Sequence, residues 1–303
     1  MRRITRLFIA ATVAMTKFSL AVQAADLRAP VPPPVYVPSW TGFYIGGSAG
    51  YGWSNSEVNP SGTTSFCNPV EFGCLPNPPL NANVLTNAQV AAIPPALATR
   101  PRGGLLGGQI GYNYQAGALV VGVETDISWT DIEGTDTQLA GPVSVFGFPG
   151  DTVTATATAD QRLRYFGTVR GRLGWVPVQP LLAYVTGGLA YGQITSSTTV
   201  SETFPGGAIS CFCTSTTAAL GTVSTTRTGW TVGGGLEYAF APNWSLKGEY
   251  LYFNLGSVSY AAGTMTATDV IFGNVASTVA VASRTTDFTG NIVRFGVNYK
   301  FGS

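Results

Sequence analysis

The chain has 303 residues, with 38 glycines, 19 prolines and 16 Lys and Arg against 15 Asp and Glu. Charged residues make up 10% of it, whereas a soluble globular domain carries about 25%, so the chain has too few charges to cover a water-facing surface of this size. It has no histidine, which excludes His-ligated zinc or haem iron, His general bases and every triad that uses imidazole.

The N-terminus has the features of a secretory signal peptide. Three arginines, at positions 2, 3 and 6, precede an apolar stretch over 7–20, and small residues over 22–24 suit cleavage. We therefore expect residues 1–24 to be removed on export, which leaves 12 basic against 15 acidic residues in the mature chain. Such a chain offers no basic surface to nucleic acid. No later run of 18 apolar residues suggests a transmembrane helix.

Residues 25–39 form a proline-rich segment, and from residue 40 apolar residues alternate with small or polar ones. A period of two indicates β-strands rather than helices. Eight such segments are expected to be strands: 41–53, 104–114, 118–129, 161–175, 181–192, 228–240, 244–255 and 288–301. Short and long connections alternate between them, as in an up-and-down barrel whose termini lie beside the short turns. We therefore predict an all-β fold, an eight-stranded antiparallel barrel over 40–301 with long outer loops.

The six tryptophans lie near the ends of the predicted strands. Trp53, Trp129 and Trp230 lie at the long-loop ends, and Trp40, Trp175 and Trp244 lie at the short-turn ends. Two rings of indole are typical of transmembrane barrels, because the indole ring prefers the level of the lipid headgroups. The pattern predicts a barrel with apolar side chains towards lipid and an aromatic girdle at each interface. An exported soluble barrel that binds a lipid inside is the alternative interpretation of the same periodicity.

The opposite face of the predicted strands carries charged side chains, which would point into the lumen. Ten residues make up this predicted charge network: Glu124, Asp126, Arg162, Arg164, Arg170, Arg172, Glu237, Lys247, Glu249 and Arg294. Eight strands enclose a lumen only wide enough for side chains, so we expect the charges to pair with one another and fill it. A narrow pore for ions or small solutes, with a basic wall on the fourth strand, is the alternative.

Four stretches resemble small outer-membrane β-barrel proteins of Gram-negative bacteria: PSWTGFYIGG at 38–47, GVETDI at 122–127, LAYG at 189–192 and RFGVNYKF at 294–301. The group most similar is the RopB-like, porin-family surface proteins of rhizobia and their relatives, which share the OmpA-type transmembrane fold. The resemblance implies an integral protein of the cell outer membrane with a structural, envelope-stabilising or surface role and no enzymatic activity.

The same resemblance implies partners and an assembly signal. In such barrels the barrel assembly machinery reads alternating residues at the end of the last strand, here Phe295, Val297, Tyr299 and Phe301. Outer-membrane lipid and lipopolysaccharide are expected around the barrel, and host or other surface ligands at the loops. Alternation continues over 151–158, so we expect some hairpins to extend beyond the membrane.

Four cysteines fall in the predicted loops of an exported chain, which favours disulfides. Cys67 and Cys74 would close a small loop, Cys211 and Cys213 would be strained as a pair, and pairing across the loops would tie them together. We expect no metal site and no cofactor. A carboxylate pair for catalysis at Glu124 and Asp126 is not favoured, because a lumen rich in arginine would keep both ionised and paired.

Overall fold

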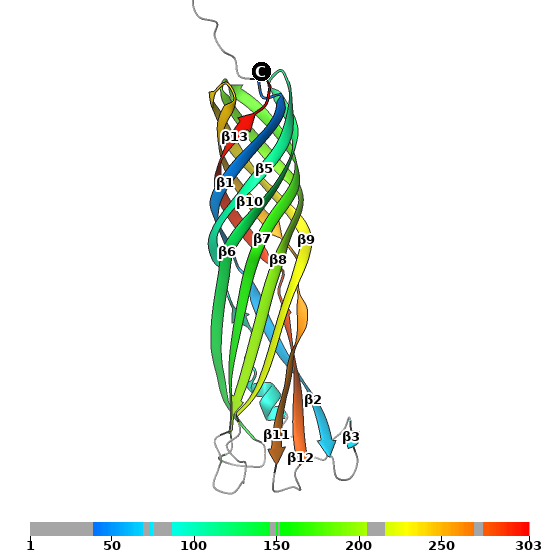
Figure 1. Cartoon of the computed structure of the whole chain (residues 1–303). Helices are drawn as coiled ribbons and strands as arrows, with labels where there is room; N and C mark the ends of the chain where they lie inside the picture. Colours follow the sequence, from blue (N-terminus) through cyan, green and yellow to red (C-terminus); the bar gives the residue numbers. More distant parts are fainter. Residues whose placement is uncertain are drawn as a thin grey trace, which may run out of the picture. The chain divides into compact units, whose positions relative to one another are not determined.

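The computed structural model describes residues 39–68, 73–75, 87–145, 150, 152–204, 216–269 and 275–302. The chain divides into two units, Met1–Tyr36 and Val37–Ser303, and the described residues all belong to the second; the expected signal peptide lies outside them. The strands (Figure 1) are β1 (Gly42–Ser54), β2 (Glu57–Asn68), β3 (Gly73–Leu75), β4 (Leu97–Ala98), β5 (Arg102–Ala116), β6 (Leu119–Ser144), β7 (Thr152–Val178), β8 (Leu181–Thr203), β9 (Thr216–Ala241), β10 (Trp244–Asn254), β11 (Ser259–Asp269), β12 (Val275–Thr285) and β13 (Thr289–Lys300).

Eight strands close into one barrel in the order β1-β13-β10-β9-β8-β7-β6-β5, and β5 pairs back with β1. Every pairing in the ring is antiparallel. Tight turns join β5 to β6, β7 to β8 and β9 to β10 at the end of the barrel where the C-terminus lies, at the top of Figure 1. We call this the short-turn end and the opposite one the long-loop end. The predicted eight-stranded antiparallel barrel is confirmed.

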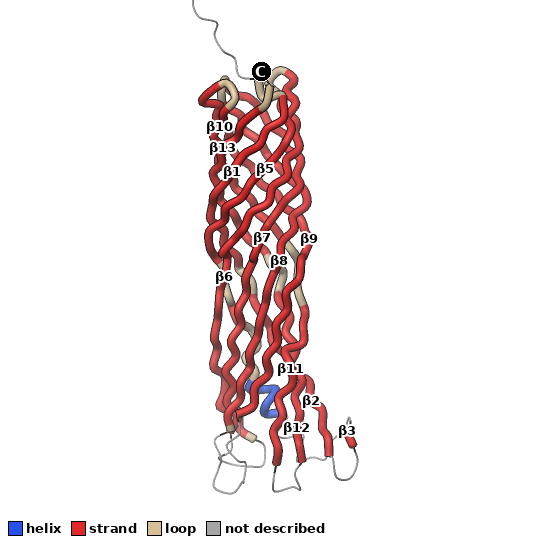
Figure 2. Tube along the Cα trace, in the orientation of Figure 1, coloured by secondary structure: helices blue, strands red, loops and turns tan. Residues whose placement is uncertain are grey.

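The barrel strands β6 to β9 extend well past the lengths that the sequence predicts. Beyond the long-loop end of the other four strands they continue as a four-stranded sheet, which we call the outer sheet (Figure 1). The first and last long connections also fold, because β2, β3, β4, β11 and β12 form a second sheet. A short helical turn at 87–92 lies between these parts (Figure 2). Among the described residues, no helix is long and apolar enough to cross a membrane.

Apolar side chains face outward over a continuous band of the barrel. On β1, for instance, Phe43, Ile45 and Tyr51 are exposed, while residues of the other parity such as Tyr44 and Ser48 point inward. An outer ring that includes Trp53, Trp129 and Trp230 borders the band at the long-loop end. Trp175 and Trp244 border it at the short-turn end, together with Tyr299 and Phe301. A band of this kind, flanked by aromatic rings, is the surface that a bilayer covers.

Trp40 is a correction to the predicted girdle. Its side chain is only 5% exposed and packs inside the short-turn end against Val120, Val176, Leu182 and Tyr184. The backbone N–H of Trp40 donates to Gln115 Oε1 at 2.8 Å. Because Trp40 precedes β1, it is free of the alternation that holds the other tryptophans outward, and it folds over the barrel mouth instead.

The interior is filled in layers along the barrel. From the Trp40 cluster towards the long-loop end, a layer of charged residues comes first. An apolar layer follows, built from Leu105, Ile132, Leu163, Phe166, Ala190, Ile194, Leu251, Phe253, Leu255, Phe288 and Ile292. Further out, small residues of β7 such as Ala157 and Ala159 pack against Met265, Val279 and Val281 of the second sheet. The second sheet therefore continues the core of the barrel outside the apolar band.

Candidate functional site

The charged layer of the lumen is the candidate site, because it gathers eight buried ionisable side chains at one level. Four are cationic and four anionic: Arg170, Arg172, Lys247 and Arg294 face Glu124, Asp126, Glu237 and Glu249. The structure places all eight at 4% exposure or less. Alternation puts them there, since each lies on the inward parity of its strand, opposite a lipid-facing neighbour.

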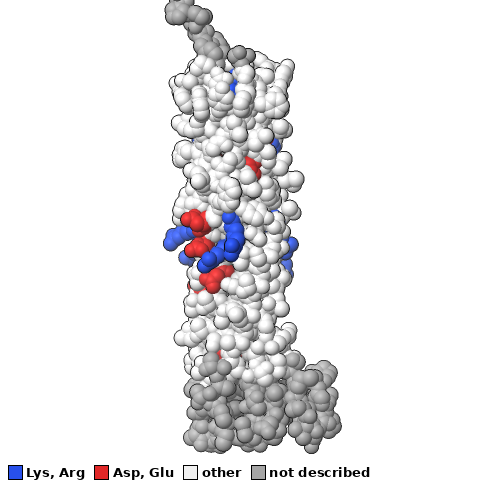
Figure 3. Space-filling model, viewed as in Figure 1, with Lys and Arg blue, Asp and Glu red and all other residues white. Residues whose placement is uncertain are grey.

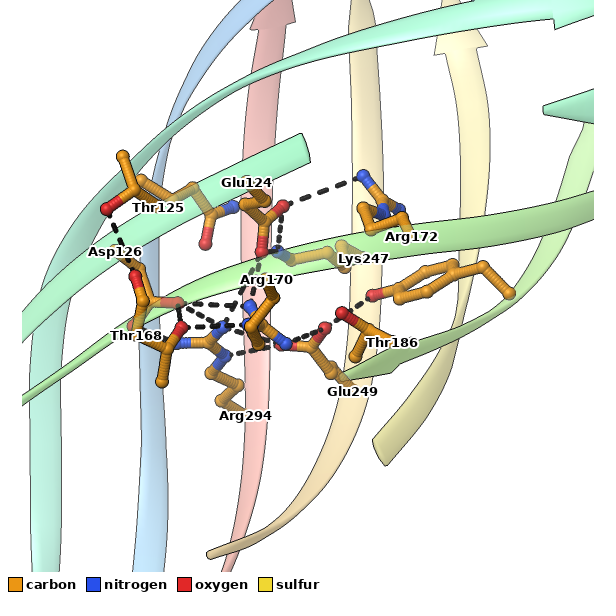
Figure 4. A network of polar contacts seen from close by, with 12 residues as sticks. Glu124, Thr125, Asp126, Thr168, Arg170, Arg172, Thr186, Lys247, Glu249 and Arg294 are labelled. Atoms are coloured by element: carbon orange, nitrogen blue, oxygen red, sulfur yellow. Dashed lines mark hydrogen bonds and ion pairs between the residues drawn. The ribbon is translucent and has the colours of Figure 1, made fainter. Parts of the chain in front are cut away.

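Two arginines bind the centre of this network (Figure 4). Arg170 contacts Glu124 Oε1 at 2.5 Å, Asp126 Oδ2 at 3.0 Å and Glu249 Oε1 at 2.9 Å. Arg294 contacts Glu249 Oε2 at 2.6 Å and Asp126 Oδ1 at 3.0 Å. Each guanidinium therefore bridges carboxylates from different strands, which the planar fork of arginine suits better than a single ammonium would.

Lys247 and Arg172 complete the neutralisation of the carboxylates. The ammonium of Lys247 lies 3.0 Å from both oxygens of Glu124. Arg172 binds Glu237 Oε2 at 2.7 Å and stacks its guanidinium 3.9 Å from the ring centre of Tyr184. Burial of a charge is costly in free energy unless the charge is paired and hydrogen-bonded. In this arrangement the cations and the anions alike have such partners.

Uncharged residues that the sequence analysis did not single out extend the network around the ring. Tyr44 donates to Glu124 Oε2 at 2.7 Å, and Tyr184 donates to Glu249 Oε1 at 3.0 Å. Asn298 donates to Glu237 Oε1 at 2.7 Å and accepts from Gln109 at 2.6 Å. With these four residues, all eight barrel strands contribute a side chain. Their inward-facing positions and polar side chains are the sequence features that could have identified them as members of the network.

Inward-facing glycines leave room for the long side chains. A Cβ on Gly50 would lie 2.7 Å from Cβ of Arg294, one on Gly235 would lie 2.7 Å from Oη of Tyr184, and one on Gly111 would overlap the Tyr44 ring. Any of these contacts is shorter than a van der Waals separation. The glycine excess of the sequence therefore includes the positions against which the network packs.

Arg162 and Arg164 do not belong to the lumen, and their prediction as lumen residues is wrong. Both are exposed, and Arg162 lies 3.4 Å from the equally exposed Glu133. The cause is an irregularity in β7, where the pairing register shifts between Leu163 and Phe166. Even-numbered residues face inward from Phe166 onward and odd-numbered ones before it. A β-bulge of this kind reverses the facing of a strand.

The remaining predicted site residues are the expected assembly signal on β13 and the four cysteines. Phe295, Val297 and Phe301 face outward along β13, with Tyr299 half-buried between Trp244 and Phe301. The backbones of Cys67 and Cys74 lie directly opposite each other in the β2–β3 pairing. Cys211 and Cys213 lie outside the described residues.

The chemistry open to the lumen network is limited by its own pairing. Glu124 and Asp126, the carboxylates with catalytic spacing, each contact both Arg170 and Arg294. Two carboxylates act as acid and base when their environments differ in charge, and these two share their arginines. Over the described ranges, no group of three or more Cys, Asp and Glu side chains is arranged to hold a metal ion.

Comparison with known proteins agrees with this architecture. A family model described as the outer membrane protein beta-barrel domain matches residues 10–301. The chain is 32% identical to the 31 kDa outer-membrane immunogenic protein of Brucella melitensis, covering 97% of each chain. It is 30% identical to the 22 kDa outer membrane protein of Rhizobium leguminosarum bv. viciae over 51% of this chain and 54% of that protein.

Among solved structures, the chain is similar to the outer membrane protein OprG from Pseudomonas aeruginosa. That likeness has 12% identity and a TM-score of 0.35, and it covers 87% of this chain and 98% of the other. The family match and the Brucella relative span the barrel from end to end. The chain belongs to the family of Gram-negative outer-membrane proteins built on this β-barrel domain.

Proposed function

We propose that this protein is a non-conducting structural barrel of the outer membrane, which stabilises the envelope and presents a tall outer sheet to the surroundings. The observation that carries the proposal is the layered packing of side chains that fills the lumen. Four cations and four anions neutralise one another in one layer, between the apolar layer around Phe166 and Phe253 and the Trp40 cluster.

The cavity at the short-turn mouth is small. The cavity there, lined by Trp40, Asn113, Glu237 and Lys300 among others, has a volume of about 20 Å³, which is close to the space of one water molecule. An ion moving beyond it would have to separate buried pairs and then cross the apolar layer, where nothing replaces its hydration. This favours the filled lumen over the alternative of a small-solute pore.

Conductance in planar bilayers tests the proposal. We expect the wild-type protein, inserted from detergent with its heat-dependent gel migration intact, to give no reproducible single-channel steps. A wide porin in the same membranes is the positive control. Reproducible wild-type steps whose ion selectivity changes in Lys247→Gln would contradict the closed lumen and support the pore.

An envelope role has its own test in the producing bacterium. Deletion of the gene is expected to raise sensitivity to detergents, and re-expression of the wild type should restore resistance. A charge-balanced lumen variant, Glu124→Gln with Lys247→Met, should restore it equally if the barrel folds, because the role requires a filled barrel and not its particular charges. Unchanged detergent sensitivity after deletion would remove the envelope role and leave the surface role.

A further inference from the structure

The exposed charges of the described residues all lie at the long-loop end, beyond the apolar band. They are Glu57, Arg100, Arg102, Asp131, Glu133, Arg162, Arg164, Arg284 and Asp287. Figure 3 shows such charges gathered at mid-height on one face, with the band above them nearly free of charge. In a barrel of this family the long loops face outward, so these residues lie at the level of the outer leaflet.

Three arginines on neighbouring strands form the densest part of this belt, which we call the arginine cluster: Arg102, Arg162 and Arg164. Arg102 on β5 lies opposite Glu133 on β6, and Glu133 lies opposite Arg162 on β7. Within the described parts of the chain, neither Arg102 nor Arg164 has an ion pair or a side-chain hydrogen bond, and the one pair of Arg162 is the exposed contact with Glu133. Counting the exposed Asp131 beside them, three cations meet two anions, and two of the guanidiniums have no partner.

The β7 bulge is what turns two of these arginines outward. Without it the parity of Arg170 and Arg172 would carry Arg162 and Arg164 into the lumen, where the neighbouring layer is apolar. Thr130 lies at the same irregularity and donates to the backbone carbonyl of Leu163. Bulges re-aim side chains at the rims of barrels, and here the result is basic groups at the rim.

The arginine cluster lies directly beyond the outer aromatic ring. Arg102 is opposite Trp53 across the β1–β5 pairing, and Arg164 precedes Tyr165, which is opposite Trp129. Trp129 is 71% exposed. Indole rings mark the headgroup level of a bilayer, so the guanidiniums lie where lipid phosphates lie. Their planar donors bind phosphate oxygens in pairs.

The surface beyond the cluster is rich in hydroxyl groups. Along β6 to β9 the outward positions include Thr135, Thr137, Thr154, Thr156, Thr158, Thr195, Ser197, Thr199, Ser201, Thr222, Ser224 and Thr226, and Leu139, Asp160 and Leu220 lie among them. They lie in register, so that Thr137 and Thr158 hydrogen-bond at 3.0 Å and Thr195 and Ser224 at 3.1 Å. Hydroxyls donate and accept alike, and such a face suits sugars better than it suits lipid tails or a charged partner.

We propose that the arginine cluster binds the phosphate groups of a phosphorylated glycolipid in the outer leaflet, namely lipopolysaccharide. Its acyl chains would lie along the apolar band on the membrane side of the cluster, and its sugars along the hydroxyl face on the other side. Three successive surfaces on the same strands, apolar, cationic and hydroxyl-bearing, match the three parts of this one molecule in the same order. The proposal is independent of whether the lumen conducts.

Titration of the detergent-solubilised full barrel with lipopolysaccharide, followed by native mass spectrometry, tests the proposal. We expect the triple variant Arg102→Gln, Arg162→Gln and Arg164→Gln to bind at least about tenfold more weakly, since the loss of even one charge-assisted hydrogen bond is worth about that factor. Lipopolysaccharide stripped of its phosphates should bind the wild type as weakly as the intact lipid binds the triple variant.

Two further variants keep the experiment decisive. Arg284→Gln removes an exposed cation from β12, outside the cluster, and should bind like the wild type. Replacement of the three arginines by lysine keeps the charge but loses the planar, paired N–H donors of the guanidinium, and should give intermediate binding. Heat-dependent gel migration checks that each variant is folded, and if the triple variant does not fold, Arg102→Gln and Arg164→Gln are measured singly. Wild-type affinity in the glutamine variants, or equal binding of the dephosphorylated lipid, would overturn the proposal.

Discussion

Glu124 is the residue on which the lumen network depends most. It accepts from Lys247, Arg170 and Tyr44 at 3.0 Å or less, with Arg172 at 3.5 Å. Buried ion networks are weak evidence for stability as a whole, because desolvation offsets much of the attraction. Removing one member is different, since its partners remain buried with their charge uncompensated.

Glu124→Gln is therefore expected to lower the free energy of unfolding by about 3–5 kcal/mol, measured by urea titration in lipid vesicles with the gel shift as readout. The matched control is Glu133→Gln, which removes an exposed carboxylate that faces an arginine and lies on the same strand. This substitution should lower the free energy of unfolding by less than about 1 kcal/mol. Equal small losses in the two variants would show that the lumen charges are not tightly coupled. Lys247→Met combined with Glu124→Gln should recover part of the loss.

Glu202, at the outer end of β8, is a second buried carboxylate with a different setting. Its Oε2 accepts from Gln89 Nε2 at 2.9 Å, while Oε1 has no hydrogen bond with any residue that the structure describes. Burial raises the pKa of Glu202 from the ordinary 4.5 to about 7, although the Gln89 hydrogen bond opposes the shift. The folded outer sheet thus holds this proton at pH values where the unfolded chain has released it.

The free energy of opening the outer sheet is expected to fall as the pH rises from about 4.5 to about 7, and to be level above that range. The loss is of the order of 3 kcal/mol. Hydrogen–deuterium exchange of β8 amides at pH 5.5 and 8, corrected for intrinsic rates, measures it. Glu202→Gln should remove the pH dependence; a variant that keeps the full dependence would assign it to another group.

The bulge in β7 is the element that sequence periodicity could not locate. Over 161–175 the polar residues at even positions form one series, and nothing in their spacing marks the change of parity at Tyr165. Only the pairing with β6 and β8 fixes it, because both neighbours keep their own alternation through this level. Strand positions within the membrane band, which are set by local alternation, were predictable from the sequence.

Deleting Tyr165 is expected to restore a regular strand without changing the facing of β7 beyond it, because Arg164 would then alternate directly with Phe166. Ala155, Ala157 and Ala159 would still face inward, and the outer core around Val279 would keep its packing. We expect the deletion variant to keep its heat-dependent migration and the wild-type resistance of the outer sheet to protease. Tyr165→Thr keeps the strand length and should also stay resistant. Protease sensitivity of the outer sheet in the deletion variant alone would mean that β7 needs the extra residue to pair with its neighbours.

At the scale of the barrel, more of the chain outside the membrane is folded into sheets than the predicted long loops suggest. The second sheet arises from low-alternation, Ser- and Thr-rich segments whose partners lie far apart in sequence, such as β2 with β12, and pairing of that kind leaves no local signal. The same limit applies to the network, since inward parity indicated which charges share the lumen but not which pairs they form. Membership of the outer-membrane family overturns the alternative of a soluble exported barrel.

The network also bears on how the ring closes. Arg294 lies on the last strand and Tyr44 on the first, and those two strands pair only when the ring is complete. Until β13 is in place, Asp126 and Glu249 lack one of their guanidinium partners. An open sheet with seven strands in place would therefore hold uncompensated charge at its centre, which makes closure cooperative: the final strand brings both the last backbone pairing and the charge balance of the lumen.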